Sequence, residues 1–338
     1  MGFLYNVRAT FVFLILIGAT SSFVLTQESL AQKPKDTKEL KTRKFQFDYS
    51  FTIEGVKQGD RVRMWLPLPR GDVSQSASII TSILPGEGIE TFEPKYGNRM
   101  LYRVIESATG DPIDAEISYN ITRREIDGLG ASAKPSKMHE NDAKLFLGPN
   151  KMVPITELPM KWKQKKADAI ATARNIYNQV DQHVSYDKSK PGYGNGDVMW
   201  VCDSKTGNCT DFHSLFIAMS RASKIPARFE IGFPIPKTKG GPIGGYHCWA
   251  SFWTPETDWV PVDISEADKN PKLKEYYFGG LTADRIRFTI GRDIDLSPKQ
   301  AGPALNYFVY PHVEVNGEPI DKKNLKLKFA FEDMDSNG

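Results

Sequence analysis

The sequence predicts an α+β fold, with an N-terminal antiparallel β-sandwich followed by a core that combines helices with antiparallel strands. Apolar and polar residues alternate from Phe45 to Phe51 and from Val62 to Leu66, a period of two that is typical of half-buried strands. Apolar residues at helical spacing then precede three further strand-like segments. A chain of 338 residues, 40% of them hydrophobic, is long enough to bury two modest cores.

Opposite charges nearly cancel along the chain, which has 44 basic and 41 acidic residues and a net charge of +3. Because no long-range field of one sign results, the composition gives no reason to expect nucleic acid as a partner. The one basic run, Lys33 to Lys44, is interpreted as a solvated linker, with linker bounds of residues 32–43.

The first 31 residues have the features of a signal peptide: positive Arg8, a mostly apolar segment over residues 10–25, and a small-residue site at residues 29–31. We expect cleavage after Ala31 and export to the periplasm or the cell exterior, with no membrane contact beyond this segment. An uncleaved anchor is the alternative. However, polar residues 20–22 leave the apolar run shorter than the about 20 residues of a membrane span.

Strand signals recur through residues 44–125 between turn-forming Gly, Pro and Asn, and they predict the N-terminal β-sandwich domain. Residues 126–164 are expected to be an irregular connecting segment. The second core, residues 165–268, is expected to begin with a helix that ends at His183, followed by a long glycine-rich loop over residues 187–208. Residues 269–338 alternate again and are expected to be a C-terminal β extension.

Cys209 is predicted to be the first residue of a helix. Asn208 is a good N-cap, and Asp211 is placed to complete a capping box. Apolar residues over Phe212–Met219 form one stripe, with polar residues such as Ser214 opposite. At this position the helix dipole lowers the pKa of a thiol, and the Cys209 N–H is available to an oxyanion.

A base and an acid for this thiol lie on the strand-like segments of residues 244–253 and 259–265. If the turn between them centres near Glu256, Trp249 pairs with Asp263. His247 and Asp263 then share a face as diagonal neighbours, about 7–8 Å apart at Cα. A slip of one residue would place them on opposite faces. In the predicted register, Cys209, His247 and Asp263 supply the nucleophile, base and orienting acid of a thiol acyl-transfer site.

Four segments resemble the core of the transglutaminase-like superfamily, most closely its bacterial exported branch: GNCTDFHSLF, IPARFEIGF, YHCW and WVPVDIS. The resemblance covers about residues 165–268, and WLPLP and FTIGRDIDL are similar to flanking parts of the same branch. It implies a papain-like core in which the cysteine helix packs on an antiparallel sheet. It also implies Cys209 as nucleophile, His247 as base and Asp263 as orienting acid. Because the superfamily includes transglutaminases, peptidases, amidases and inactive relatives, the resemblance does not choose the reaction.

Four further residues are candidates for the cleft or the oxyanion hole. Trp249 matches the His-x-Trp pattern of the family and is expected either to wall the cleft or to belong to the core. His213 lies one helical turn after the thiol, where a base is poorly aimed, so a surface or supporting role is favoured. Trp200 and Tyr186 are candidate oxyanion donors, because aromatic groups have this role in relatives.

Three cysteines in an exported chain suggest that one thiol stays free. Cys248 is expected to point away from the site, since it neighbours His247 on a strand. It either pairs with Cys202 in a disulfide or stays a thiol, and a Cys202–Cys209 bridge is the rival connectivity. These cysteines and two histidines also form a pool of zinc ligands. No tight CxxC pair is present, however, so neither a metal nor any other cofactor is expected.

The C-terminal arginines have a structural interpretation. Arg285, Arg287, Arg292 and Asp293 are expected to form ion pairs that dock the C-terminal strands, and a substrate-carboxylate role for one arginine is the alternative.

The sequence therefore predicts an exported cysteine acyltransferase or hydrolase that acts on amide bonds, either as a peptidase or amidase or as a transglutaminase-type enzyme. Its substrate would be a peptide, a protein or a cell-wall amide. The alternative is a non-catalytic binding or assembly module with the same fold. Neither the substrate nor the oligomeric state follows from the sequence.

Overall fold

A computed structural model describes residue 2 and residues 39–156, 158 and 168–334, and all elements below belong to the unit of residues 38–338. The expected signal peptide, with its anchor alternative and most of the basic linker, lies outside the described residues. Among the residues that are described, no helix has the length and apolar character needed to cross a membrane.

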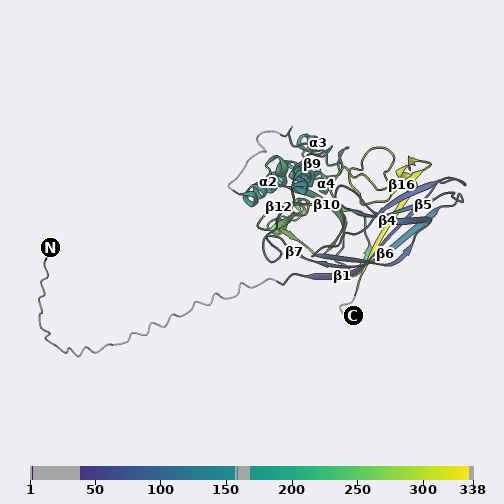
Figure 1. Ribbon diagram of the computed structural model, residues 1–338, viewed down its shortest axis with the longest axis horizontal. Helices are drawn as coiled ribbons and strands as arrows, with labels where there is room; N and C mark the ends of the chain where they lie inside the picture. Colours follow the sequence, from purple (N-terminus) through teal and green to yellow (C-terminus); the bar gives the residue numbers. More distant parts are fainter. Residues whose placement is uncertain (1, 3–38, 157, 159–167, 335–338) are drawn as a thin grey trace, which may run out of the picture. The chain divides into compact units, whose positions relative to one another are not determined.

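Strands from both ends of the chain build two five-stranded antiparallel sheets (Figure 1). The first consists, in order, of β11 (Gly240–Pro242), β18 (Leu325–Asp333), β1 (Thr42–Ile53), β6 (Ile113–Arg124) and β3 (Gln75–Ile83). The second consists of β17 (Glu318–Pro319), β16 (His312–Val315), β2 (Val62–Pro67), β5 (Arg99–Ile105) and β4 (Glu87–Phe92). The C-terminal strands β18 and β16 thus pair directly with the N-terminal strands β1 and β2.

A third antiparallel sheet carries the residues of the predicted site. It consists, in order, of β13 (Asp258–Val262), β12 (His247–Thr254), β10 (Ala227–Pro234) and β15 (Arg285–Ile290). The helix α4 (Cys209–Ala222) packs on β12 and β10, and α2 (Ala169–His183) packs on α4. The predicted α+β class, with a cysteine helix on an antiparallel sheet, is therefore confirmed.

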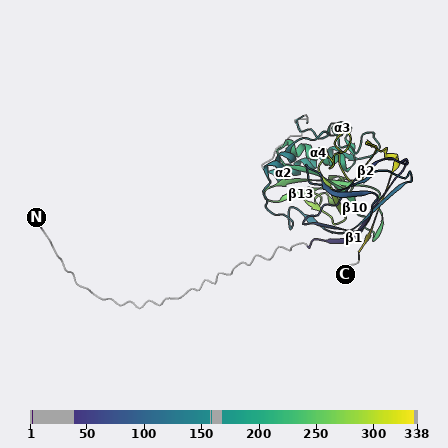
Figure 2. The same ribbon diagram turned by 45° about the vertical axis from the view of Figure 1, so that its right-hand side comes forward.

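The alternating aromatic residues of β1 explain how the first and third sheets share one core. The ring of Phe47 lies 5.2 Å from that of Phe233 on β10 and 5.7 Å from that of Phe288 on β15. Tyr49, two residues later, faces the same way and lies 5.7 Å from Phe288. In Figure 2, α2, α3 and α4 lie together above β10 and β13, with β1 below. The strand-rich part therefore supports the sheet that holds the predicted site.

Two segments expected to be irregular contain helices. Residues 187–208 include α3 (Val198–Ser204), which forms because Asp197 accepts hydrogen bonds from two backbone amides and because Val198 and Val201 are buried. The connecting segment includes α1 (Glu140–Leu147), which buries Phe146. In both cases a few buried apolar contacts outweigh local composition that favours a loop.

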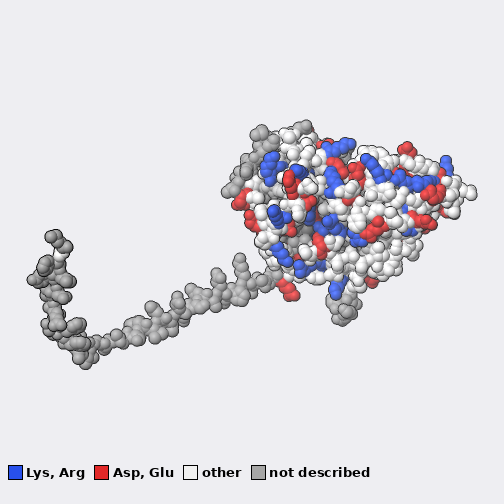
Figure 3. All heavy atoms as spheres, viewed as in Figure 1, with Lys and Arg blue, Asp and Glu red and all other residues white. Residues whose placement is uncertain are grey.

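Short elements complete the described fold: the two-stranded pairs of β7 (Ile126–Asp127) with β14 (Gly280–Leu281) and of β8 (Ser185–Tyr186) with β9 (Thr206–Gly207), and the helix α5 (Ile264–Lys269). On the surface seen in Figure 3, acidic and basic side chains are interspersed, as the nearly balanced composition leads one to expect.

Candidate active site

Cys209 is the first residue of α4, and the predicted capping box is confirmed. The Asn208 side chain accepts a hydrogen bond from the Thr210 amide at 2.8 Å, and Asp211 Oδ2 accepts one from the Asn208 amide at 2.8 Å. The cap holds the start of the helix in a single geometry. Cys209 itself is 3% exposed, so its thiol lies just beneath the surface.

Asp211 also ties the preceding loop to the helix. Its carboxylate accepts hydrogen bonds from the amides of Gly194 at 2.7 Å and Gly196 at 2.9 Å. Arg292 donates to the carbonyl oxygens of Asn195 at 2.6 Å and of Gly196 at 3.0 Å. Gly196 has φ +60°, and a Cβ there would clash with Ser214 and Arg292. A side chain at this position would therefore push the loop away from α4.

The polar face of α4 is buried, because other segments cover it. Thr210 Oγ1 hydrogen-bonds to the Tyr246 hydroxyl at 2.9 Å, Ser214 to Arg292, and Arg221 to the Ala227 carbonyl at 3.0 Å. The apolar stripe of the sequence is therefore present, but the opposite face contacts the protein as well.

His247 and Asp263 meet in the predicted register. Ala250 pairs with Val262, which places Trp249 opposite Asp263, one residue beyond the end of β13. His247 Nε2 lies 2.8 Å from Asp263 Oδ2. The Cys209 side chain hydrogen-bonds to His247, and since Nε2 is engaged by the carboxylate, Nδ1 is the ring nitrogen left for the thiol. The structure thus brings all three residues of the predicted set together.

Asp263 is held by four donors. It lies at the N-cap of α5 rather than on a strand, and its Oδ1 accepts hydrogen bonds from the Glu266 amide and the Ser265 hydroxyl, both at 3.2 Å. Its Oδ2 accepts from Arg285 Nη1 at 2.9 Å as well as from His247. Although burial opposes ionisation, the charges of His247 and Arg285 hold the pKa of Asp263 well below its usual range.

The electrostatics of the site favour a thiolate beside an imidazolium. Burial alone would lower the pKa of His247, but the Asp263 carboxylate outweighs it and raises that pKa to about 9. Hydrogen bonds from Cys248 and from His247, together with the His247 charge, hold the pKa of Cys209 well below its ordinary value despite burial. Near neutral pH the arrangement is therefore a charged nucleophile next to a charged acid.

Comparisons with known proteins show what this chain is similar to. Residues 158–264 match the family model described as the Transglutaminase-like superfamily. The chain carries a transglutaminase-like core. It is similar to an uncharacterized protein of Haemophilus influenzae, at 26% identity over an alignment of 329 positions that covers 83% of this chain and 89% of that protein.

One solved structure shares the fold at low identity, and a second is similar over part of the chain. A protein of Cytophaga hutchinsonii, named as a candidate cysteine protease, superposes with a TM-score of 0.56 at 16% identity, covering 89% of this chain and 93% of the other. The periplasmic domain of TgpA from Pseudomonas aeruginosa is also similar, with a TM-score of 0.38 at 16% identity, covering 70% of this chain and 91% of that domain.

In the transglutaminase-like core, His213 is buried and joins two segments of the site. Its Nε2 accepts a hydrogen bond from the Ile264 amide at 3.0 Å, so the proton of the neutral ring is on Nδ1, which donates to the Cys209 carbonyl. Burial lowers the pKa of His213 to about 4. The surface role considered for His213 is thus wrong, and the residue connects the start of α4 to the residue after Asp263.

Trp249 lies beneath His247 and belongs to the core. It is fully buried, with its ring centroid 6.3 Å from that of His247. The Arg285 guanidinium lies 5.0 Å from the indole, and Trp249 Nε1 donates to Glu230 Oε2 at 3.2 Å. Of the two interpretations for this residue, the structure supports packing behind the base.

The expected ion pairs of the C-terminal arginines form in part. Arg285 pairs with Asp263, and Arg287 pairs with Glu230 at 2.9 Å. Arg292 instead binds the loop carbonyls before α4. The substrate-carboxylate alternative gains nothing from Arg285, because its guanidinium is buried against Asp263.

The two oxyanion candidates lie on either side of the loop that precedes Cys209. The ring of Tyr186, on β8, is 6.4 Å from that of Phe212 and 4.1 Å from Lys269 Nζ. Trp200 is on α3, where its indole abuts Gly192. Neither placement assigns an oxyanion contact, so both roles stay predictions.

The expected orientation of Cys248 is wrong. Its Sγ points toward α4, 3.7 Å from Thr210 Oγ1, and its side chain hydrogen-bonds to Cys209. All three cysteines of the described region are thiols, so neither the Cys202–Cys248 nor the Cys202–Cys209 disulfide is present. Cys202 lies on α3 instead, where its carbonyl contacts His183 at 3.0 Å. Within the same region, no three His, Cys, Asp or Glu side chains gather as a metal-binding group.

Sequence reasoning missed Tyr246 as part of the site. Its hydroxyl contacts Thr210 and accepts from Asn208 Nδ2 at 3.2 Å, so it braces the helix cap from the side of β12. Its amide donates to the Tyr310 hydroxyl at 3.2 Å. The only sequence signal was its position directly before His247.

Proposed function

We propose that this protein is an exported thiol enzyme that cleaves or transfers acyl groups at amide bonds, with Cys209, His247 and Asp263 as its catalytic residues. The observation that carries the proposal is the buried hydrogen-bonded series from the Cys209 thiol through His247 to Asp263. Such a series is what nucleophilic attack followed by protonation of a leaving amine requires. The transglutaminase-like match of residues 158–264 supports the same class of chemistry.

In the proposed reaction, the Cys209 thiolate attacks the amide carbonyl carbon and forms a tetrahedral oxyanion. The Cys209 amide, one of the helix-start N–H groups that lack an intrahelical acceptor, donates to that oxyanion. His247 then gives its Nδ1 proton to the leaving nitrogen as the C–N bond breaks, leaving a thioester on Cys209. Water or a second amine attacks the thioester, His247 takes back a proton, and the thiolate leaves.

The proposed substrate is an amide of a peptide, a protein or the cell wall, and the proposed location is the periplasm or the cell exterior. Export rests on the signal-peptide pattern of residues 1–31. Both fates of the thioester are tested in parallel. An unstructured glutamine-rich protein with a fluorescent primary amine reports transfer, and internally quenched peptides report hydrolysis.

The decisive experiment measures iodoacetamide alkylation of Cys209 from pH 4 to 9, by mass spectrometry, in the wild type and in His247→Ala. We expect fast alkylation with a depressed apparent pKa that returns toward the ordinary thiol value of about 8.5 in the variant. Cys209→Ala is expected to lower amide turnover by at least about 1000-fold. Cys202→Ser is the matched control, because it removes a thiol that lies on α3.

Unchanged turnover in a folded Cys209→Ala protein would refute the mechanism. Slow alkylation of Cys209 with an ordinary thiol pKa, combined with no turnover, would favour the non-catalytic binding or assembly module instead.

A further inference from the structure

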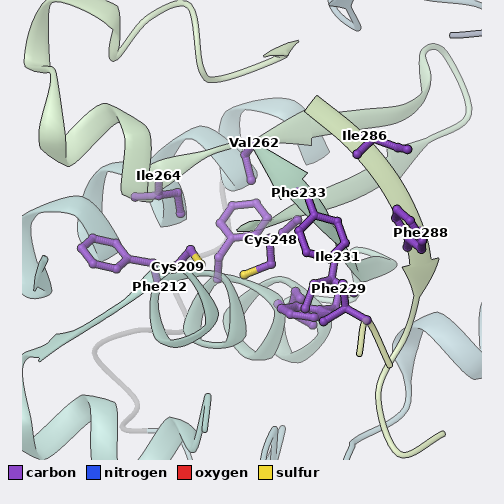
Figure 4. Packing of buried hydrophobic residues seen from close by; sticks show 14 of the residues in the cluster. Cys209, Phe212, Phe229, Ile231, Phe233, Cys248, Val262, Ile264, Ile286 and Phe288 are labelled. Carbon is purple, nitrogen blue, oxygen red and sulfur yellow. The ribbon is translucent and has the colours of Figure 1, made fainter. Parts of the chain in front are cut away.

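Two thiols, not one, lie at the start of α4. Cys209 and Cys248 hydrogen-bond to one another, although they lie on different elements, α4 and β12, and are 39 positions apart in the sequence. Figure 4 labels both side chains, which lie near one another among buried apolar residues. In the proposed acyl transfer, Cys248 serves only as a hydrogen-bond partner of the nucleophile and not as a reacting group.

Cys248 is enclosed in the site, where its sulfur has Thr210 and His213 as polar neighbours besides Cys209. It is fully buried, and its Sγ is 3.7 Å from Thr210 Oγ1 and 3.9 Å from His213 Nδ1. The proton on His213 Nδ1 is donated to the Cys209 carbonyl, so this ring does not deprotonate Cys248. A buried cysteine in apolar surroundings is ordinarily inert, and what distinguishes Cys248 is its contact with an activated thiol.

Cys209 contacts two consecutive residues of β12, His247 and Cys248, because its thiol lies at the end of that strand. Cys209 begins α4, His247 begins β12, and the Cys209 side chain hydrogen-bonds to His247 as well as to Cys248. The Cys209 thiol therefore has an imidazole and a second sulfur as neighbours at the same time. A disulfide needs the sulfur atoms at about 2.05 Å, so the two side chains must move closer together when the bond forms.

We propose that Cys209 and Cys248 form an oxidation site, in which a hydroperoxide oxidises Cys209 and Cys248 converts the product to a reversible Cys209–Cys248 disulfide. The inference rests on the proposed function only for its consequence, which is that the enzyme is switched off while its nucleophile is protected.

The chemistry balances without any further reactant. The Cys209 thiolate attacks the distal oxygen of the hydroperoxide and the O–O bond breaks. The leaving oxygen takes the proton of the His247 imidazolium and departs as an alcohol, or as water from hydrogen peroxide, and Cys209 becomes a sulfenic acid. The Cys248 sulfur then attacks the Cys209 sulfur, and the hydroxyl leaves with the Cys248 proton as water. Each sulfur loses one electron, and the two electrons reduce the peroxide bond. An external dithiol reverses the disulfide by thiol exchange.

The test treats the full chain with hydrogen peroxide and maps cysteines by mass spectrometry of unreduced digests. In the wild type we expect a disulfide that joins the peptides of Cys209 and Cys248, so that both cysteines stop reacting with iodoacetamide together. Dithiothreitol is expected to restore more than about 90% of the alkylation of both cysteines. Cys202→Ser is expected to behave in the same way, since Cys202 lies on α3.

Cys248→Ser and Cys248→Ala are expected to lose this protection. In both, Cys209 gains oxygen and proceeds to sulfinic or sulfonic acid, so that dithiothreitol restores less than about 10% of its alkylation. Using two variants guards against one that fails to fold, and circular dichroism of each reports on folding.

Three results would overturn the inference: a disulfide that contains Cys202, sulfinic acid at Cys209 in the wild type with Cys248 still open to alkylation, or no change with peroxide. None of these readouts uses a substrate. Failure of the oxidation site is therefore distinguishable from failure of the proposed function, which is measured by amide turnover of Cys209→Ala.

Discussion

Replacing His213 by Gln tests whether a buried neutral imidazole holds the site together. In the structure its Nε2 accepts from the Ile264 amide at 3.0 Å and its other nitrogen donates to the Cys209 carbonyl. A second proton would set Nε2–H against the Ile264 N–H, two donors facing each other. The nearest charges are Asp263 Oδ1 at 3.7 Å, the Cys209 thiolate and the His247 imidazolium.

The magnitude follows from the pKa of His213, which burial lowers to about 4. An unfolded histidine titrates near 6.5, so the unfolded state binds more protons between pH 6.5 and 4. Because the pKa is depressed on folding, stability is fully present above about pH 6.5 and falls as the pH drops to about 4. A gap of about 2.5 pKa units corresponds to about 3 kcal/mol of unfolding free energy.

The assay is urea unfolding at pH 4, 5, 6 and 7 for the wild type, for His213→Gln and for His139→Gln, a control at an exposed histidine. The advantage of the wild type over His213→Gln is expected to shrink by about 3 kcal/mol from pH 7 to pH 4, because other titrating groups cancel in the difference. His139→Gln should track the wild type. A wild-type advantage that stays constant over this range would refute the assignment of a neutral buried His213.

Two further predictions concern the charges of the site. Above about pH 9, amide turnover is expected to fall as His247 loses the proton it gives to the leaving nitrogen. Alkylation of Cys209, which needs no acid, should not fall, and a parallel decline of both rates would contradict the role of His247. Arg285→Met leaves the Asp263 carboxylate with one cation fewer. We therefore expect the free energy of unfolding measured in urea to fall by about 3–5 kcal/mol. The decline of amide turnover at high pH is also expected to begin at a higher pH than in the wild type. Arg285→Lys keeps the charge, and equal effects of the two substitutions would argue against an electrostatic role.

Local patterns were enough to predict the parts of the site that depend on one element or one turn. The capping box needed only Asn208 and Asp211 around Cys209, and the β12–β13 register needed only the turn between Trp249 and Asp263. In each case the relevant residues are close in sequence, so period and turn length decide where their side chains point.

What the sequence did not reveal depends on contacts between distant segments. Arg285 on β15 reaches Asp263 at the N-cap of α5 across 22 positions of the chain, and Arg292 reaches the loop at Gly196 across 96 positions. Alternation of side chains along a strand predicts Cys248 on the side of β12 away from the site. That alternation does not show where a strand ends, and His247 and Cys248 are the first two residues of β12. At the end of β12, the start of α4 contacts two consecutive residues.

The charges of the site explain why a thiolate is stable in so buried a place. Asp263 carries one negative charge, and Arg285, 2.9 Å away, balances it. The same carboxylate raises the pKa of His247 and so keeps the imidazole protonated. The Cys209 thiolate balances the positive charge of that imidazolium. Because isolated buried charges are costly, the four groups are stable only as two balanced pairs. Oxidation of Cys209 removes one negative charge from this set, so a Cys209–Cys248 disulfide should lower the pKa of His247, although the Asp263 carboxylate still raises it.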